Sequence, residues 1–173
     1  MKKLYILFLL AVCLLSTADS FSQGGNTCAQ ALAAPITLPL NVAGSTCAAT
    51  NDVQFTNAPC LNVGYQQGPD WIYYFCSNQT GQVTIVLSNL TVNSFASISV
   101  WTGCPTAGNC VGAAVTQTGA TLALTVPVVN TQCYYIVVDN WPLPNCITYN
   151  ISISYVAPPP PPKCPRPPKS SPG

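Results

Sequence analysis

Basic side chains and glutamate are absent from most of this chain. Residues 23–157, hereafter the body, contain no Lys, Arg, His or Glu, and their only carboxylates are Asp52, Asp70 and Asp139. Most hydrolytic and group-transfer chemistry needs a positioned proton carrier or an activated nucleophile, usually His, Glu, Lys or a paired acid. The sequence therefore predicts a module that is not an enzyme. A body without positive charge is also a poor partner for nucleic acid.

Long apolar runs are missing too, except at the start. Two lysines precede an apolar run over residues 4–15, and small and polar residues follow it. This pattern predicts a signal peptide over residues 1–22, with Gln23 as the new N-terminus, and a secreted or cell-surface protein. The alternative is a lipid anchor on Cys13, which is disfavoured because Val12 is bulky for the position before a lipidated cysteine. No other apolar stretch approaches the ~20 residues of a membrane-spanning helix.

Cysteine, by contrast, is abundant. An exported protein is oxidised by default, so we expect four disulfides in the body. Eight cysteines allow about 105 pairings, and sequence alone does not choose among them. A zinc-thiolate site is disfavoured because the chain has no His and no Cys-x-x-Cys pair. The eight cysteines of the body are Cys28, Cys47, Cys60, Cys76, Cys104, Cys110, Cys133 and Cys146.

Two of the possible pairings are favoured by the residues between the cysteines. Pro105 and Gly108 can fold the chain back on itself, which favours a bridge from Cys104 to Cys110. The next is a bridge from Cys133 to Cys146 around the loop that contains Trp141.

The last segment, residues 158–173, is rich in proline. Proline fixes φ and lacks an amide donor, so we expect an extended, stiff polyproline II spacer. A linker to another domain is favoured over an SH3-like ligand, and a chain that ends on a spacer is expected to belong to a longer protein. Cys164 is the odd cysteine of this tail and predicts an intermolecular disulfide or a partner in a downstream domain.

The body shows the periodicity of β-strands. Apolar and polar residues alternate over 147–155, which predicts a strand with one buried face. Gly, Pro and Asn separate several such segments, and the body is long enough for one domain. This pattern predicts an all-β protein, an antiparallel β-sandwich over residues 23–157 stapled by disulfides. The predicted strands are 36–42, 70–75, 83–87, 96–100, 120–126, 134–138 and 147–155.

Several short motifs in the body resemble a known family. They are Asn26-Thr-Cys-Ala-Gln-Ala31, Asp70-Trp-Ile-Tyr-Tyr-Phe75, Gly81-Gln-Val-Thr-Ile85, Ser99-Val-Trp-Thr-Gly-Cys104, Tyr134-Tyr-Ile-Val-Val138 and Tyr149-Asn-Ile-Ser-Ile153. Together they resemble secreted modules of Bacteroidetes-type bacteria related to the bacterial pre-peptidase C-terminal domain. The resemblance implies a jelly-roll-like β-sandwich that is attached to secreted enzymes or repeated in large surface proteins. Such modules assist folding, attachment or polymer binding.

The three aspartates of the body have two interpretations. As oxygen ligands without a cationic partner, Asp52, Asp70 and Asp139 are candidates for a calcium site. The interpretation that we favour is that Asp52 and Asp139 are turn residues and that Asp70 begins a strand. The resemblance implies calcium in collagen-binding relatives, but this chain has residues 111–115, Val-Gly-Ala-Ala-Val, where the acidic cluster of that pattern usually follows the cysteine loop. We therefore predict no cofactor, with calcium as the alternative.

Aromatic residues supply the other candidate site. Trp101 falls on the opposite strand face from Ala96, Ile98 and Val100, which predicts a partly exposed ring. Together with Trp141 and Tyr65 it could form a platform on which sugar rings stack. The alternative is that Trp101 covers the loop after Cys104 and that Trp141 fills one end of the sandwich.

The sequence as a whole predicts an accessory or adhesion module of a larger extracellular or cell-surface protein. Its partner would be an extracellular polymer or a surface protein. The alternative function is a carbohydrate-binding domain appended to a secreted hydrolase. A surface with so few charges does not repel its own copies, which is compatible with adhesion.

Overall fold

The computed structural model describes the body of the chain with short gaps. The described residues are 23–54, 60–61, 63–91, 95–117, 119–141 and 145–156. The predicted signal peptide and the proline-rich tail lie outside them, and so do Cys13 and Cys164, to which the predicted lipid anchor and intermolecular disulfide belong. No helix in the described part of the chain is long and apolar enough to cross a membrane.

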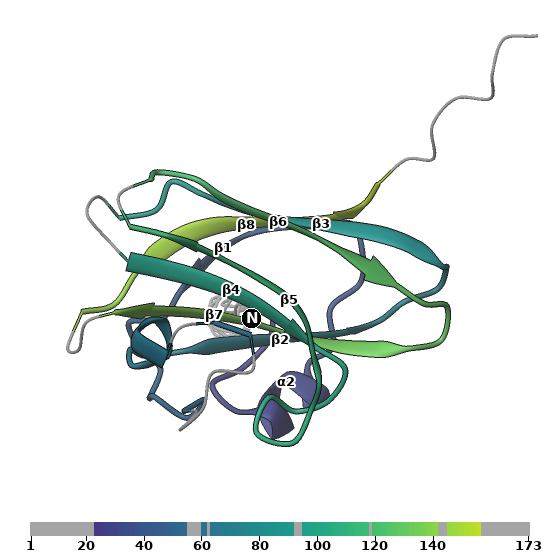
Figure 1. Cartoon of the computed structure of the whole chain (residues 1–173), viewed down its shortest axis with the longest axis horizontal. Helices are drawn as coiled ribbons and strands as arrows, with labels where there is room; N and C mark the ends of the chain where they lie inside the picture. Colours follow the sequence, from purple (N-terminus) through teal and green to yellow (C-terminus); the bar gives the residue numbers. More distant parts are fainter. Residues whose placement is uncertain are drawn as a thin grey trace, which may run out of the picture.

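In the described residues, eight strands form two four-stranded antiparallel sheets that pack face to face (Figure 1). The strand orders are β1-β8-β3-β6 and β2-β7-β4-β5, the arrangement of an eight-stranded jelly roll. The predicted all-β, jelly-roll-like sandwich is therefore confirmed. The elements are α2 (Cys28–Ala33), β1 (Leu40–Ser45), η1 (Val63–Gln66), β2 (Trp71–Cys76), β3 (Gly81–Ser88), β4 (Phe95–Trp101), β5 (Cys110–Thr116), β6 (Leu122–Val128), β7 (Cys133–Trp141) and β8 (Thr148–Tyr155).

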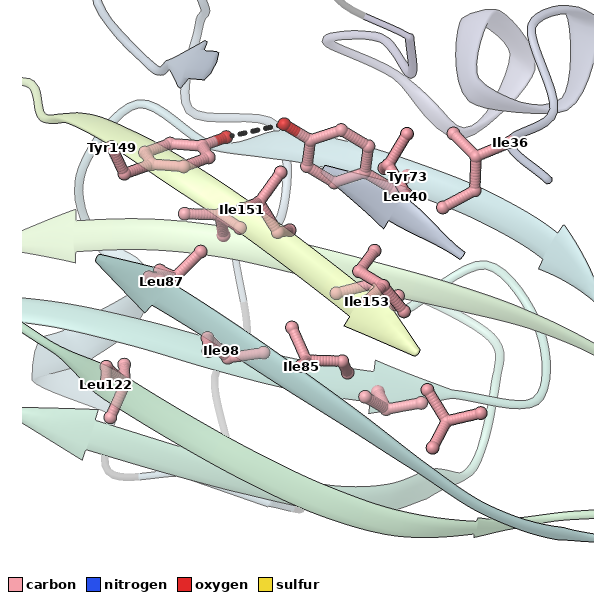
Figure 2. Close-up of a cluster of buried hydrophobic side chains, with 14 of the residues drawn as sticks. Ile36, Leu40, Tyr73, Ile85, Leu87, Ile98, Leu122, Tyr149, Ile151 and Ile153 are labelled. Atoms are coloured by element: carbon pink, nitrogen blue, oxygen red, sulfur yellow. Dashed lines mark hydrogen bonds between the residues drawn. The ribbon is translucent and has the colours of Figure 1, made fainter. Parts of the chain in front are cut away.

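The main core lies between the two sheets and follows the period of two. On β8, Ile151 and Ile153 have no exposed surface, whereas Ser154, which follows Ile153, is exposed. Isoleucine and leucine side chains from β3, β4 and β6 meet them in the interior (Figure 2). Two tyrosines also reach into this core, and their hydroxyls satisfy each other across the sheets, with Tyr73 Oη 3.1 Å from Tyr149 Oη.

A second layer covers part of the sheet β2-β7-β4-β5 on its outer face, the face that points away from the other sheet. Helix α2 begins at an N-cap, where the Thr27 hydroxyl accepts from the Gln30 amide and the Gln30 side chain accepts from the Thr27 amide. Ala31 of this helix packs into a small apolar cluster with Ile72 and Val137. The outer face is therefore partly buried, which a period of two along single strands does not reveal.

Two strand predictions differ from the structure. The strand expected over 36–42 begins only at Leu40, because the Ile36 amide donates to Tyr74 of β2 and Pro39 has no amide to contribute. Strand β5 was not predicted, because its residues Gly112, Ala113 and Ala114 have low strand propensity and do not alternate. It nevertheless pairs with β4, with a register shift that skips Val111.

Four disulfides join segments far apart in the sequence. They are Cys28–Cys104, Cys47–Cys146, Cys60–Cys110 and Cys76–Cys133, with sequence separations of 76, 99, 50 and 57 residues. Two of them, Cys28–Cys104 and Cys60–Cys110, fasten the covering layer to the β4–β5 hairpin. The expectation of four bridges among the eight body cysteines is confirmed.

Both of the favoured pairings were wrong. The turn after Cys104 closes through backbone bonds instead, because the amides of Ala107 and Gly108 donate to the Cys104 carbonyl. Cys133 begins β7 and Cys146 follows the other end of that strand, so roughly 27 Å of extended chain separates them. Cys133 pairs instead with Cys76, its direct neighbour in register on β2.

Candidate ligand-binding surface

The strand register arranges the outer face of β2-β7-β4-β5 in rows that run across the sheet. At one end, Trp101 of β4 lies beside Tyr135 of β7, and at the other end Phe95 of β4 lies beside Trp141 of β7. Between them is a row that contains Ser97 and Asp139. The two ends differ in what covers them, and the difference decides which of them is available to a ligand.

The Trp101 end is closed. Trp101 has no exposed surface, and its indole N–H donates to Ser99 Oγ at 2.8 Å. Its ring belongs to the small apolar cluster beneath α2, with Val53 and Ala31. The prediction of a partly exposed Trp101 was wrong, although its strand face was placed correctly. Helix α2 and two disulfides bury that face, so Trp101 takes no part in a platform.

At the opposite end, three aromatic rings in contact make up what we call the aromatic surface: Tyr65, Phe95 and Trp141. Trp141 is 37% exposed, and its ring lies edge-on to Phe95 with centroids 5.1 Å apart. Tyr65, which lies in η1, adds a ring whose centroid is 6.3 Å from that of Phe95. The rings of Tyr65 and Trp141, two of the three predicted platform residues, thus both contact Phe95, whereas Trp101 lies elsewhere. A role of these rings in binding stays a prediction.

Phe95 was missed because it precedes the alternating stretch from which β4 was predicted. Its position opposite Trp141 depends on the pairing of β4 with β7. The alternation of residues along one strand does not predict which residues of another strand it will face. The only available signal was that Phe95 and Trp101 have the same parity along β4.

Two glutamine side chains border the aromatic surface. Gln67 Oε1 accepts from the Trp141 indole N–H at 3.2 Å, and Gln117 Nε2 donates to the Tyr65 hydroxyl at 2.9 Å. Both glutamines are exposed. They fix the orientation of the outer rings, and each retains amide capacity for a ligand because a carboxamide has two donor hydrogens and two acceptor lone pairs. The surface therefore combines apolar rings with neutral hydrogen-bonding groups.

Asp70 lies at the edge of the row next to this surface. It has no exposed surface, and its Oδ2 accepts from the amides of Asp52 and Val53, both at 2.8 Å. Burial raises the pKa of the Asp70 carboxyl to about 6, against the lowering effect of these two amides and with a small contribution from the Asp52 charge. Asp70 thus holds residues 52–53 against the sheet.

Asp139 lies beside Asp70 in the same row. Asp70 immediately precedes β2 and Asp139 immediately follows Val138, the partner of Trp71 in register, so the two carboxyls lie close together and their charges interact. Asp139 is 1% exposed, and its carboxyl accepts hydrogen bonds from the backbone amides of Asn140 and Gly68. Burial raises the pKa of Asp139 to about 9, with the nearby Asp70 charge adding to the effect.

The structure brings together two of the three calcium candidates and leaves Asp52 on the rim. Asp52 is exposed, and its Oδ2 accepts from the side chains of Asn26 and Thr50. In the described part of the chain, no group of three or more His, Cys, Asp or Glu residues is placed to hold a metal ion. Calcium at these aspartates stays a prediction. Asp139 lies within β7, so it is not the turn residue that we favoured.

No protein-family model and no curated protein matches this sequence. Among solved structures, the chain is similar to the pre-peptidase C-terminal domain of a collagenase from Bacillus anthracis, with 13% sequence identity and a TM-score of 0.43. The match covers 69% of this chain and 92% of that domain. An overlap this loose carries no argument about function, which therefore rests on the site itself.

Proposed function

We propose that this chain is an exported, non-catalytic accessory module of a larger extracellular or cell-surface protein, and that it attaches that protein to a polymer. The observation that carries the proposal is the exposed ring of Trp141, held edge-on to Phe95 in a surface bordered by neutral amides. Exposed aromatic rings fixed by packing lose little conformational entropy when a ligand covers them, which makes them effective anchors for binding.

The chemistry of the body supports attachment rather than turnover. It has no Lys, Arg, His or Glu, so proton transfer in the body would fall to its three aspartates. Two of these, Asp70 and Asp139, are buried beneath backbone segments rather than presented to a substrate. The four disulfides support export, because such bridges persist in oxidising compartments. The signal peptide over residues 1–22 is part of this proposal.

A polysaccharide is the polymer that the aromatic surface fits best. Sugar rings present flat C–H faces to aromatic side chains, and their hydroxyls both donate and accept hydrogen bonds, as do the carboxamides of Gln67 and Gln117. The alternative function, a carbohydrate-binding domain carried by a secreted hydrolase, uses the same surface. It differs only in the protein to which the module is attached.

Binding of the full chain to polysaccharides tests the proposal. The probes are insoluble chitin and cellulose in pull-down assays, and soluble xylan and mannan in affinity electrophoresis. Trp141→Ala is expected to weaken binding of the polymer that the parent retains by at least about tenfold, since a Trp anchor typically contributes 2 kcal/mol or more. Trp141→Phe, which keeps a ring but not the indole N–H, is expected to bind with intermediate affinity.

Leu32→Ala is the matched control, because Leu32 is 52% exposed but lies on α2 at the far end of the outer face. It is expected to bind as the parent does. Equal binding by the parent and Trp141→Ala would overturn the role of the aromatic surface. Absence of binding to all four polysaccharides would overturn the proposed ligand class.

A further inference from the structure

The edge strands of the two sheets differ in how they are protected. In the described part of the chain, β1 and β6 are the edges of one sheet, and β2 and β5 are the edges of the other. An edge strand presents backbone N–H and C=O groups that can pair with a strand of another chain. Proteins usually prevent such pairing with a covering segment, a proline, a bulge or a charged side chain. Strands β2, β5 and β6 are protected in one of these ways, and β1 is not.

Both edges of the sheet β2-β7-β4-β5 are obstructed. On β2, the amide and the carbonyl of Ile72 both bond to Gly25 at 2.8 Å, and the Tyr74 carbonyl accepts from the Ile36 amide. On β5, the register shift that skips Val111 interrupts the row of backbone groups. A second strand therefore finds no regular row of partners on either side of this sheet.

Strand β6 is protected by a proline. The Val156 amide donates to the Gln82 carbonyl, so the even-numbered residues of β3 bond toward β8 and the odd-numbered ones toward β6. This alternation leaves Ala123, Thr125 and Pro127 on the free side of β6. Pro127 has no amide to donate, which shortens the row available for pairing.

Strand β1 has an unbroken free side. Immediately after it, the Thr46 amide donates to the Ile147 carbonyl at 2.9 Å, and this pair continues the register of β1 with β8. Backbone bonds alternate in an antiparallel pair, so the even-numbered residues of β1 bond to β8. The odd-numbered residues, Asn41, Ala43 and Ser45, therefore turn both backbone groups to the free side. Among the described residues, no backbone hydrogen bond reaches these three from that side.

The side chains of β1 do not block this edge either. Residues 34–50 contain no charged residue, and β1 contains no proline and pairs with β8 without a bulge. Asn41 and Ala43 are exposed. The three residues with free backbone groups are also symmetric about Ala43. An antiparallel copy of the same strand would place Asn41 opposite Ser45, an amide opposite a hydroxyl, and Ala43 opposite itself.

We propose that β1 pairs with β1 of a second copy of this chain, antiparallel about a two-fold axis at Ala43. The pairing joins the two β1-β8-β3-β6 sheets into one continuous sheet. A second copy is the partner that fits, because the row of free groups is self-complementary and its neutral surroundings do not repel an identical strand. The inference goes beyond the proposed function and does not depend on polymer binding.

The short strand sets the strength of this contact. Interfaces that bury less than about 1,200 Å² in total are typically transient, so we expect a reversible dimer rather than a permanent one. Such a dimer would carry two aromatic surfaces, and two linked sites bind a polymer more tightly than one.

Sedimentation velocity of the full chain from about 10 μM to about 1 mM tests the proposal, because this range covers the dissociation constants of weak dimers. Every protein measured carries Cys164→Ser, so that a disulfide through the tail does not contribute. The sedimentation coefficient of the parent is expected to rise with concentration toward that of a dimer. Ala43→Lys is expected to weaken the dimer by at least about tenfold, because two like charges then lie directly opposite each other.

Two further samples locate the contact. Ala123→Lys is the matched control, because Ala123 is also an exposed alanine on an edge strand of the same sheet, but at the opposite edge. It is expected to dimerise as the parent does. Ala43→Asp alone is expected to be monomeric, and an equimolar mixture with Ala43→Lys is expected to recover the dimer, because opposite charges then meet at the axis. Recovery also shows that both variants fold.

The proposal is overturned if the parent stays monomeric over the whole range, or if Ala43→Lys dimerises as the parent does. A dimer that Ala43→Lys abolishes but the mixture does not recover would contradict the two-fold register. Amide hydrogen exchange gives an independent readout: exchange at Ala43 should slow as the concentration rises. Slow exchange at Ala43 in a monomer would show that another segment of the same chain covers β1, and would overturn the proposed partner.

Discussion

The inner and outer faces of the sheet β2-β7-β4-β5 are made by alternate residues of the same strands. On the inner face, Tyr73, Phe75, Ile98 and Ile136 are at most 1% exposed and pack against the other sheet. On the outer face, the rows pass from a closed apolar cluster through Ser97 and two carboxyls to an exposed aromatic surface. One face is uniform, and the other changes its chemistry from row to row.

This difference separates stability from function within single strands. The inner face needs the opposite sheet along its whole length, so its residues are apolar throughout. The outer face is covered at one end by α2 and two disulfides, which leaves the other end free to hold a site. Trp101 and Trp141, one at each end, show the result: the first is buried and the second is 37% exposed.

Among the substitutions, the largest loss of stability is expected from a cavity on the inner face. Ile136→Ala removes a fully buried side chain and is expected to lower the free energy of unfolding by about 3–4 kcal/mol. Trp141→Ala on the outer face of the same strand is expected to cost less than about 1.5 kcal/mol, because its ring is partly in water already. Urea denaturation at pH 7 measures both. Equal losses would contradict the division between the faces.

Removing a fastening of the covering layer is expected to cost less than the larger core cavities. The double change Cys28→Ala and Cys104→Ala opens the link from α2 to the β4–β5 hairpin and is expected to lower the free energy of unfolding by about 2–4 kcal/mol. Near-ultraviolet circular dichroism should report altered surroundings of Trp101. Unchanged stability and an unchanged spectrum would show that the layer is held without this disulfide.

The acid pair should make stability depend on pH. Because the folded-state pKa of Asp139 is raised from 3.8 to about 9, the folded state holds this proton more tightly than the unfolded state. Stability is therefore complete below about pH 4 and declines by at most about 1.4 kcal/mol per pH unit as the pH rises toward 9. Asp70, raised to about 6, adds to the decline between about pH 4 and 6.

Thermal unfolding from pH 5 to pH 9 tests this dependence. The Tm of the parent is expected to fall with increasing pH, while that of Asp139→Asn should fall less and exceed it at pH 9. Asp52→Asn, whose side chain is exposed, is the control and should follow the parent. A parent Tm that rises over this range would show that the pair is not a buried, protonated one.

The smallest effect is expected from calcium. Ligand binding to the folded state raises Tm, because the free energy of unfolding increases with the logarithm of the ligand excess over Kd. Since no group of three acidic or other metal-binding side chains is gathered in the described residues, the Tm in excess calcium chloride is expected to equal that in EDTA. A rise that Asp70→Asn abolishes would instead establish the calcium site considered from the sequence.

The inner face could be predicted from the sequence because it obeys a period of two. The residues Ile151 and Ile153 of β8 and the corresponding positions of β3 and β6 are where the alternation placed them. The class of fold followed from the same signal. Disulfide pairing did not, because Cys76 and Cys133 become neighbours only when β2 and β7 pair.

The outer face was predicted only in part, and the reason is physical. Parity assigned Trp101 to the correct side of β4, but it could not show that α2, a segment about 70 residues away in the chain, would cover that side. The same limit applies to Phe95 and to the meeting of Asp70 with Asp139. These neighbours are set by strand register and by loops that fold back over the sheet.

The most direct test of the central claim is the protonation state of Asp139 in the full chain. The body has only three aspartates, so carbon-13 labelling of the aspartate carboxyl gives few signals, and the signal that disappears in Asp139→Asn is that of Asp139. We predict a protonated carboxyl at pH 7 that titrates near pH 9. An Asp139 carboxyl that is already ionised at pH 7 would contradict a buried, uncompensated carboxyl in the row next to the aromatic surface.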